Sequence, residues 1–191
     1  METDYLSSVQ KQFEYYKSLG ERTIAQVPED KLFWQANEES NSIATIVKHL
    51  SGNMLSRWTD FLTSDGEKAT RDREAEFDND ITNKEALLKL WGAGWKCFLD
   101  TLYVLKDEDL NKEIFIRNMG HTVIEAINRQ LAHYPYHIGQ IVFLGKMICG
   151  PSWVSLSIPR GKSDVYNAEK FSKPKHKEHF TDEFIEKKRK L

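Results

Sequence analysis

The segment HTVIEAINRQLAHYPYHIGQIVFLGKM, residues 121–147, decides the expected fold of this chain. Its apolar residues recur at three- and four-residue steps, which is the period of an α-helix and not the alternation of a β-strand. The helix is expected to begin at a capping box formed by Thr122 and Glu125, and to end at Gly150-Pro151. Its second half is apolar around much of its circumference, which indicates a helix that is mostly buried.

Three segments before this one show the same helical period, and they cover about residues 4–27, 42–62 and 82–105. The third of them is expected to begin at another capping box, formed by Thr82 and Glu85. No segment shows convincing strand alternation. Four amphipathic helices of this length predict an all-α fold, a four-helix bundle.

The connections between and after the helices differ in character. Residues 63–81 are long and charged, and their length would allow a crossover that leaves the second and third helices parallel. Residues 151–172 lack a helical period but contain several large apolar side chains, so we expect an ordered irregular segment that packs on the bundle. The chain is therefore divided into one domain, residues 1–172, and a basic tail, residues 173–191, in which a short helix can form from about Thr181.

The composition limits the classes of partner and compartment. With 191 residues, 40% of them apolar, the chain is long enough for one domain with a core. Its 27 Lys and Arg residues nearly balance its 29 Asp and Glu residues, so its charge gives no reason to expect nucleic acid or a membrane as a partner. Two cysteines without close spacing argue against a disulfide framework, and no secretory signal or membrane-spanning run is visible. We expect a cytoplasmic protein.

Three histidines form the candidate site. His133 and His137 lie four residues apart in the predicted fourth helix, so both imidazoles can reach one metal ion. His49 is the only other histidine well inside a predicted helix, and it is the candidate for a third ligand. Three protein ligands would leave coordination positions open, as in catalytic zinc sites. The alternative is that all three lie on solvated helix faces, and not on two polar flanks that face each other across a cleft.

Several other residues have two interpretations. Glu125 and Arg129 have the spacing of a helix ion pair, which we favour, but Arg129 could instead contact a substrate beside the histidines. Arg160 and Lys162 lie in a basic loop that could bind a carboxylate or a thiol at the cleft, with a solvated turn as the alternative. Pro135, between the paired histidines, could displace one imidazole, and no pattern identifies a catalytic residue. The remaining histidines and the cysteines are expected to cap a helix, to pack or to be solvated: His121, His176, His179, Cys97 and Cys149.

Three stretches resemble a known superfamily: SIATIVKHLSGNMLSRW (residues 42–58), the segment 121–147 and SWVSLSIPRGKSDVYN (residues 152–167). They resemble the DinB/YfiT-like superfamily, and more closely its uncharacterised Bacillus-type branch, a domain of unknown function. In that superfamily, one histidine of the second helix and an H-x-x-x-H pair on the last core helix bind a divalent metal. By this resemblance those positions correspond to His49, His133 and His137, whereas the proline within the pair departs from the pattern.

The resemblance implies a fold, a cofactor and a class of reaction. The fold would be a DinB/YfiT-like four-helix bundle that holds one divalent metal ion, with zinc or nickel expected before iron or manganese. Characterised relatives include thiol S-transferases that use bacillithiol and isomerases that depend on mycothiol or glutathione. We therefore expect a metal-dependent thiol transferase or related metalloenzyme, acting on a low-molecular-weight thiol or another small molecule. The alternative is a non-catalytic, stress-related protein that binds a metal or a ligand. Members are often dimers, and we expect a homodimer joined through the first and third helices.

Overall fold

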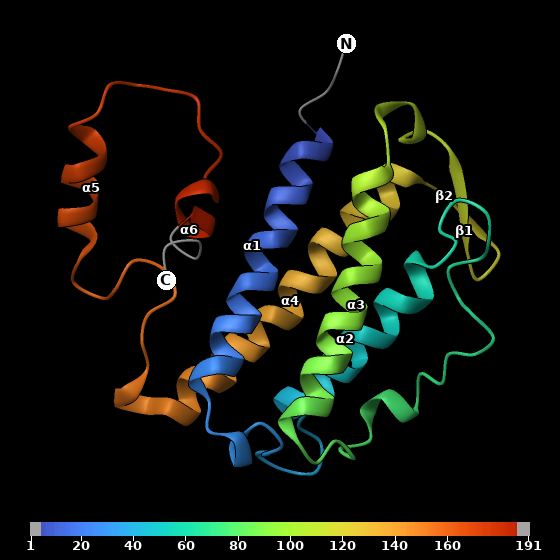
Figure 1. The fold of residues 1–191 in the computed structure, drawn as a ribbon, viewed down its shortest axis with the longest axis horizontal. Coiled ribbons are helices and arrows are strands. Elements are labelled where there is room, and N and C mark those ends of the chain that lie inside the picture. Colours follow the sequence, from blue (N-terminus) through green and yellow to red (C-terminus); the bar gives the residue numbers. More distant parts are fainter. Residues whose placement is uncertain (1–4, 187–191) are drawn as a thin grey trace.

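The computed structural model describes residues 5–186, and it shows a mostly helical chain with one small sheet (Figure 1). Four long helices carry the core: α1 (Tyr5–Gln26), α2 (Ile43–Trp58), α3 (Lys84–Val104) and α4 (Val123–Cys149). Four short 3-10 helices lie in the connections: η1 (Glu29–Lys31), η2 (Ala75–Phe77), η3 (Asp107–Asp109) and η4 (Gly150–Ser152). The predicted helix start at Asp4 lies outside the described residues.

The beginnings of three helices are fixed by side-chain caps. The Ser42 hydroxyl accepts a hydrogen bond from the Thr45 amide at the start of α2. The predicted capping box of α4 is confirmed, because Thr122 and Glu125 each accept a hydrogen bond from the other's backbone amide. The capping box predicted for α3 is wrong: the cap is Asn83, whose side chain accepts from the amide of Ala86.

The direction of the helices confirms the predicted crossover. In Figure 1, α2 and α3 both run upward, whereas α1 and α4 run downward. Residues 59–83 return along one side of the molecule, through η2, to join the parallel pair α2 and α3. This return segment therefore lies beside α2, where it can contribute side chains to a site on that helix.

A β-hairpin precedes α4, and the expectation that no strands are present is wrong. Strands β1 (Glu113–Ile116) and β2 (Met119–Thr122) pair antiparallel. The two turn residues, Arg117 and Asn118, have φ values of 55° and 60°, as a type I′ turn requires. Their amides both donate to the Asp65 carboxylate, at 2.9 and 2.8 Å, so the return segment holds the turn in place.

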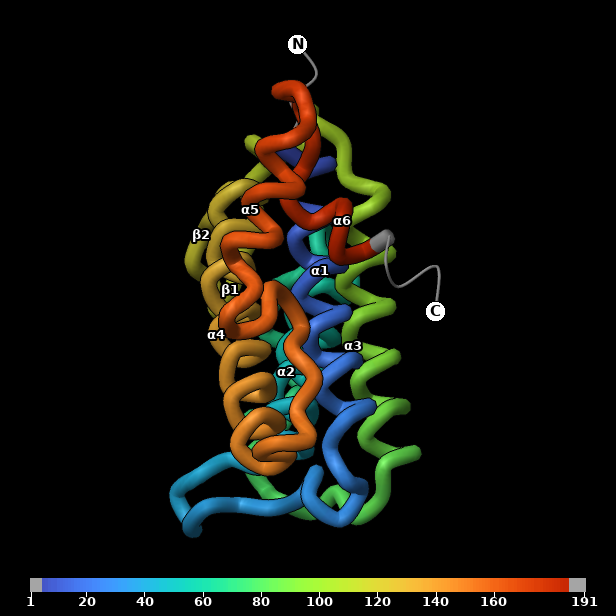
Figure 2. Tube along the Cα trace, turned by 90° about the vertical axis from the view of Figure 1, so that its left-hand side faces the viewer, coloured from blue at the N-terminus to red at the C-terminus, as the bar shows by residue number. Residues whose placement is uncertain are grey.

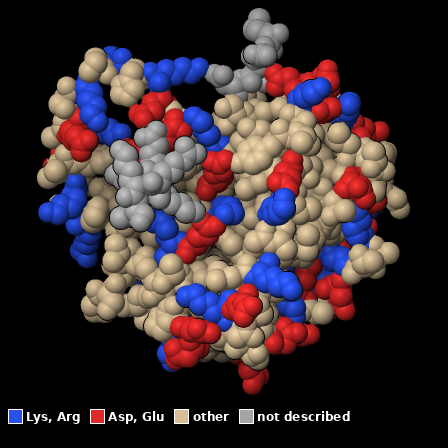
Figure 3. Space-filling model, in the orientation of Figure 1, with Lys and Arg blue, Asp and Glu red and all other residues tan. Residues whose placement is uncertain are grey.

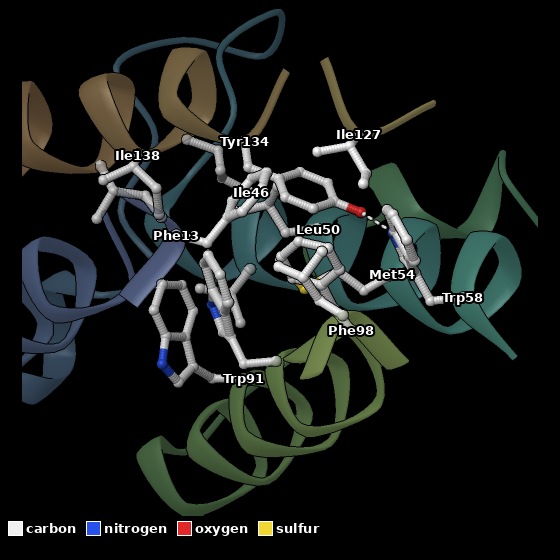
Figure 4. Packing of buried hydrophobic residues seen from close by; sticks show 14 of the residues in the cluster. Phe13, Ile46, Leu50, Met54, Trp58, Trp91, Phe98, Ile127, Tyr134 and Ile138 are labelled. Carbon is white, nitrogen blue, oxygen red and sulfur yellow. Dashed lines mark hydrogen bonds between the residues drawn. The ribbon is translucent and has the colours of Figure 1, made fainter. Parts of the chain in front are cut away.

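The core is built on aromatic side chains from all four long helices. Phe13, Trp58, Phe98 and Tyr134 are buried, and they meet in the centre of Figure 4. The Phe98 ring lies 4.5 Å from that of Phe13 and 4.6 Å from that of Trp58, between centroids. The Trp58 indole donates to the Tyr134 hydroxyl at 3.0 Å, which fixes α4 against α2.

The chain after α4 forms an arm, residues 150–186, that lies along the outer side of α1 (Figures 1 and 2). Leu156 is buried and its carbonyl accepts from Arg22, so the prediction of a packed segment is confirmed at this point. The expectation of an irregular segment is wrong for α5 (Ser163–Phe171), a helix with no buried residue. The expected short tail helix is confirmed as α6 (Asp182–Glu186), which packs on α1.

The surface carries both signs of charge. Figure 3 shows Lys and Arg interspersed with Asp and Glu over the face that it draws, without a broad basic area. Of the helices within residues 5–186, none combines the length and the apolar character that crossing a membrane requires.

Candidate metal centre

The structure brings the three predicted histidines together between α2 and α4. The Nε2 atom of His133 lies 3.4 Å from that of His49 and 3.1 Å from that of His137. One nitrogen from each residue lies within 4.8 Å of the other two. His49 is buried, whereas the other two side chains are half-buried, so the cluster reaches the surface from the side of α4.

The Nδ1 atom of each imidazole lies within hydrogen-bond distance of a side-chain oxygen. The Nδ1 atom of His49 lies 2.9 Å from Oε2 of Glu76. The Nδ1 atoms of His133 and His137 lie 3.2 and 2.9 Å from the side-chain oxygens of Gln130 and Gln140, respectively. Because an oxygen acceptor favours a hydrogen on Nδ1, the three Nε2 atoms are left with bare lone pairs. Bare lone pairs that face one another at such distances repel unless a proton or a metal ion lies between them.

Two of the three nitrogen–nitrogen separations match those expected around one metal ion. Two nitrogens that each lie about 2.1 Å from an ion are about 3.0–3.4 Å apart when the angle at the ion is about 90–110°. The two Nε2 separations from His133, 3.1 and 3.4 Å, fall in this range. Three such ligands would leave positions open to a substrate or to water, and an oxygen partner behind each imidazole is typical of histidines that bind metals.

Burial keeps the α4 pair in the neutral form that a metal requires. It lowers the pKa of His133 to about 3, and the nearby charges of His137 and His49 act in the same direction. Burial also lowers the pKa of His137, although the hydrogen bond to Gln140 opposes this shift. Both imidazoles are therefore unprotonated near neutral pH, with lone pairs available for a ligand.

Glu76 is a residue of the candidate site that the sequence did not identify. Its carboxylate also accepts two hydrogen bonds from Arg71, from Nε at 2.7 Å and from Nη2 at 2.9 Å. Burial raises the pKa of Glu76, but the hydrogen bonds from His49 and Arg71 outweigh it and hold the pKa below its usual value. Glu76 is therefore ionised beside the Nδ1 atom of His49. The only local signal was a charged segment between two predicted helices.

Gly52 makes room for this carboxylate. A Cβ atom at position 52 would lie 2.2 Å from Oε1 of Glu76, which is too close for any side chain. The glycine lies one helical turn after His49, so the return segment approaches α2 beside the histidine that it orients. The ring of Phe77 stacks on His49, with centroids 5.0 Å apart, and covers it from the same segment.

The backbone of α4 presents its two histidines on one face despite the proline between them. The helix continues through Pro135, and the Nε2 atoms on either side of it stay 3.1 Å apart. Tyr134, next to His133, is fully buried, and its hydroxyl donates to Asn53 of α2 at 3.1 Å. The concern that Pro135 displaces one imidazole is therefore wrong.

The polar flank of α2 is buried, so a solvated face is the wrong interpretation for His49. Thr45, Asn53 and Ser56 are each less than 7% exposed. Thr45 contacts Asn79, and Ser56 donates to the carbonyl of Gly66, both in the return segment. This flank therefore faces protein and not water.

The three predicted substrate-contacting residues lie in two places. Arg129 is exposed, and its charge acts on His133, so it lies beside the cluster. Its expected ion pair is wrong: Glu125 binds Thr122, and Arg129 forms no ion pair within residues 5–186. Arg160 and Lys162 are exposed in the C-terminal arm, and Figure 1 shows this arm on the side of α1 away from α3. The structure therefore does not bring these two residues to the histidines.

The remaining histidines and cysteines lie away from the cluster. His121 lies in β2 and not at a helix cap. His179 is half-buried and its Nε2 lies 3.1 Å from the Ser8 hydroxyl, so the expectation that it is solvated is wrong, whereas His176 is exposed as expected. Cys97 and Cys149 are free and half-buried.

Comparison with known proteins gives a family but no activity. Residues 1–162 match a family described as a protein of unknown function, DUF1572. The chain belongs to this family. The match covers the three histidines and Glu76, and it stops before α5. Neither a curated protein nor a solved structure matches the chain.

Proposed function

We propose that the chain holds one divalent metal ion on His49, His133 and His137, and uses it as a metal-dependent thiol S-transferase or related metalloenzyme. One observation carries the metal site: three Nε2 atoms converge while an oxygen atom holds each Nδ1 from behind. Among metals, zinc or nickel is expected before iron or manganese, because nitrogen ligands generally bind nickel and zinc more tightly than iron or manganese.

We further propose that α1 to α4 form a four-helix bundle of the DinB/YfiT-like kind. The parallel pair α2 and α3, joined by the long return segment, supports this arrangement, and so does the position of one histidine on α2 and two on α4. A cytoplasmic location is part of the same proposal, because low-molecular-weight thiols are kept reduced there.

The protein's own groups have defined parts in such a reaction. A bound divalent ion would lower the pKa of a thiol at its open position, so that a thiolate is available near neutral pH. Glu76 and Arg71 hold the His49 ring, and the exposed Arg129 places a positive charge where an anionic thiol would approach. In S-transfer the thiol gives up its proton to water, the thiolate sulfur bonds to an electrophilic carbon of the acceptor, and the leaving group departs with the electrons of the broken bond.

Metal content tests the site directly. Protein purified without a nickel column is expected to contain one divalent ion per chain, with metal–nitrogen distances of about 2.0–2.2 Å. His49→Ala and His137→Ala should lose the ion while the helix content by circular dichroism stays unchanged. His176→Ala is the control, because its imidazole is exposed in the C-terminal arm. Full metal occupancy in both of the first two variants would show that the ligand set is wrong.

A thiol-conjugation assay separates an enzyme from a protein that only binds metal. Bacillithiol and monochlorobimane are expected to react faster with the metal-loaded protein than with chelator-treated protein or with His133→Ala. A metal-loaded wild type that gives no acceleration would contradict the transferase and favour the alternative, a non-catalytic metal- or ligand-binding protein. The two experiments thus test the metal site and the reaction independently.

A further inference from the structure

A cavity next to the candidate metal centre is lined by Glu76 but not by His49. This cavity, of about 470 Å³, lies between one face of α2, Leu90 of α3 and the return segment. None of the three histidines lines it, whereas Gly52 and Glu76 do. Its volume falls in the range of cavities that hold small molecules.

Most of the charged groups at this cavity already have partners. Lys48 forms an ion pair with Asp80 at 2.6 Å, and Arg71 binds Glu76. The carboxylate of Asp72 accepts from the amide of Ala75 at the start of η2. These groups form part of the wall; Asp72 has no ion pair within residues 5–186, but its Oδ1 atom accepts the hydrogen bond from Ala75.

Among the described residues that line the cavity, Lys68 is the one cation without an ion pair, and Asp60 is the one carboxylate that accepts no hydrogen bond. In the described part of the chain, neither Lys68 nor Asp60 forms an ion pair, although both line the cavity. The ammonium of Lys68 donates to the backbone carbonyl of Asp65, whereas no described group donates to the carboxylate of Asp60. Burial lowers the pKa of Lys68, and the charge of Asp60 opposes this shift, so the two groups lie close enough to interact. Together they offer one cation and one anion to a ligand in the cavity.

The rest of the lining supplies apolar area and hydroxyl groups. Leu55 and Leu90 line the cavity on α2 and α3, and Leu55 is 39% exposed. Thr59 and Thr70 add hydroxyls that can donate or accept. A ligand that fits this lining carries both charges at one end and an apolar group at the other.

We propose that this cavity binds a small zwitterion of the amino-acid class. Its carboxylate pairs with Lys68, its ammonium pairs with Asp60, and its side chain lies against Leu55 and Leu90. Charged hydrogen bonds of this kind are roughly twice as strong as neutral ones, so each should contribute measurably to binding. The proposal does not depend on the metal-dependent reaction, because no histidine of the metal centre lines the cavity.

Titration calorimetry with the full chain and the twenty standard L-amino acids tests this site. At least one amino acid is expected to bind, with a dissociation constant of about 1 mM or lower. Lys68→Met and Asp60→Asn should each weaken that binding by about tenfold or more, because each removes one charged hydrogen bond. The amide of the same amino acid, which lacks the carboxylate, and the matching acid without the ammonium should bind as weakly.

Matched controls separate loss of the site from loss of the fold. Lys89→Met and Asp164→Asn remove the same charges at exposed positions outside the cavity, and they should bind like the wild type. His133→Ala should also bind normally, so failure of the metal centre leaves this result intact. The proposal is overturned if no amino acid binds at about 10 mM, ten times a millimolar constant. It is equally overturned if the amide or the acid binds as well as the amino acid, or if His133→Ala abolishes binding.

Discussion

At the scale of single residues, the carboxylate of Glu76 fills the space beside α2 that a side chain at position 52 would occupy. Glu76 carries a negative charge to the Nδ1 side of His49, and it is held there by two hydrogen bonds from Arg71. Residues that orient a metal-bound histidine from behind commonly change metal affinity by about 10- to 100-fold. Glu76→Gln keeps the shape of the side chain but removes its charge, so we expect the metal dissociation constant to rise by about that factor, measured by competition with a chelator.

Gly52→Ala tests the same arrangement from the helix side. The added Cβ would lie 2.2 Å from Glu76, so the carboxylate must move away from His49, and metal affinity should fall to about the level of Glu76→Gln. Helix propensity alone predicts the opposite, because alanine stabilises a helix by about 1 kcal/mol over glycine. Gly139→Ala on α4 is the control, since no atom lies within 4 Å of its added Cβ. Normal metal affinity in Gly52→Ala would mean that Glu76 does not orient the ligand.

The sequence located the three histidines of the candidate site but not the residues that hydrogen-bond to them, for physical reasons. His133 and His137 are one helical turn apart, so local spacing alone places them on one face. His49 was assigned by the resemblance and by its position inside a helix. Glu76 lies 27 residues from His49 in a segment without periodicity, and only the folded return segment brings the two together. Contacts of this kind leave no local pattern.

At the scale of elements, the long helices were predictable and the hairpin was not. Each of α1 to α4 carries an apolar stripe whose period is visible in the sequence, and the predicted bounds agree with the structure to within a few residues. The strands β1 and β2 are four residues each, too short to show clear alternation. Their turn uses Arg117 and Asn118 where a glycine would have signalled a type I′ turn, and its acceptor, Asp65, lies 52 residues away from Arg117.

The hairpin turn should respond to acid through Asp65. Hydrogen bonds from the amides of Asn118, Glu67 and Arg117 lower the pKa of this carboxyl from 3.8 to about 2. A group whose pKa is lower in the folded state contributes stability above its unfolded value and loses it as pH falls through the folded value. The turn should therefore loosen as pH falls from about 4 to about 2.

Amide hydrogen exchange at Arg117 and Asn118 measures this loosening. The wild type should exchange faster at pH near 2 than near 4, after correction for the intrinsic rate. Asp65→Asn cannot change charge, so its corrected exchange at the two amides should be fast and independent of pH in this range. Equal protection in both proteins would show that the carboxylate does not stabilise the turn.

At the scale of the whole molecule, the structure leaves α3, and not the outer face of α1, available for contact with a second copy of the chain. The outer face of α1, expected to contribute to a homodimer, is covered by the chain's own C-terminal arm, in which Asp182 pairs with Lys11. On α3, Leu88, Tyr103 and Val104 remain exposed. The homodimer stays a prediction, and light scattering at micromolar concentration should give twice the chain mass; a particle of 22.3 kDa would contradict it.

The C-terminal arm should stabilise the molecule through α6 and not through α5. Tyr15 packs against Phe180 and Phe184, and Thr181 is fully buried, whereas α5 has no buried residue. An isolated helix as short as α5 is marginal in water, so it adds little by itself. We therefore expect a chain that ends at residue 172 to unfold at a lower temperature than the full chain, by an amount equivalent to about 1–3 kcal/mol.

A chain that ends at residue 162 completes the comparison, because it also lacks α5. It should unfold at nearly the same temperature as the chain that ends at residue 172 in a calorimetric scan, since no buried residue is lost between the two. Both shortened chains should bind metal normally, because the histidines and their oxygen partners all precede residue 141. A further large fall in stability on removal of α5 would mean that this helix has a partner surface, and loss of the metal would mean that the arm supports the centre across α1.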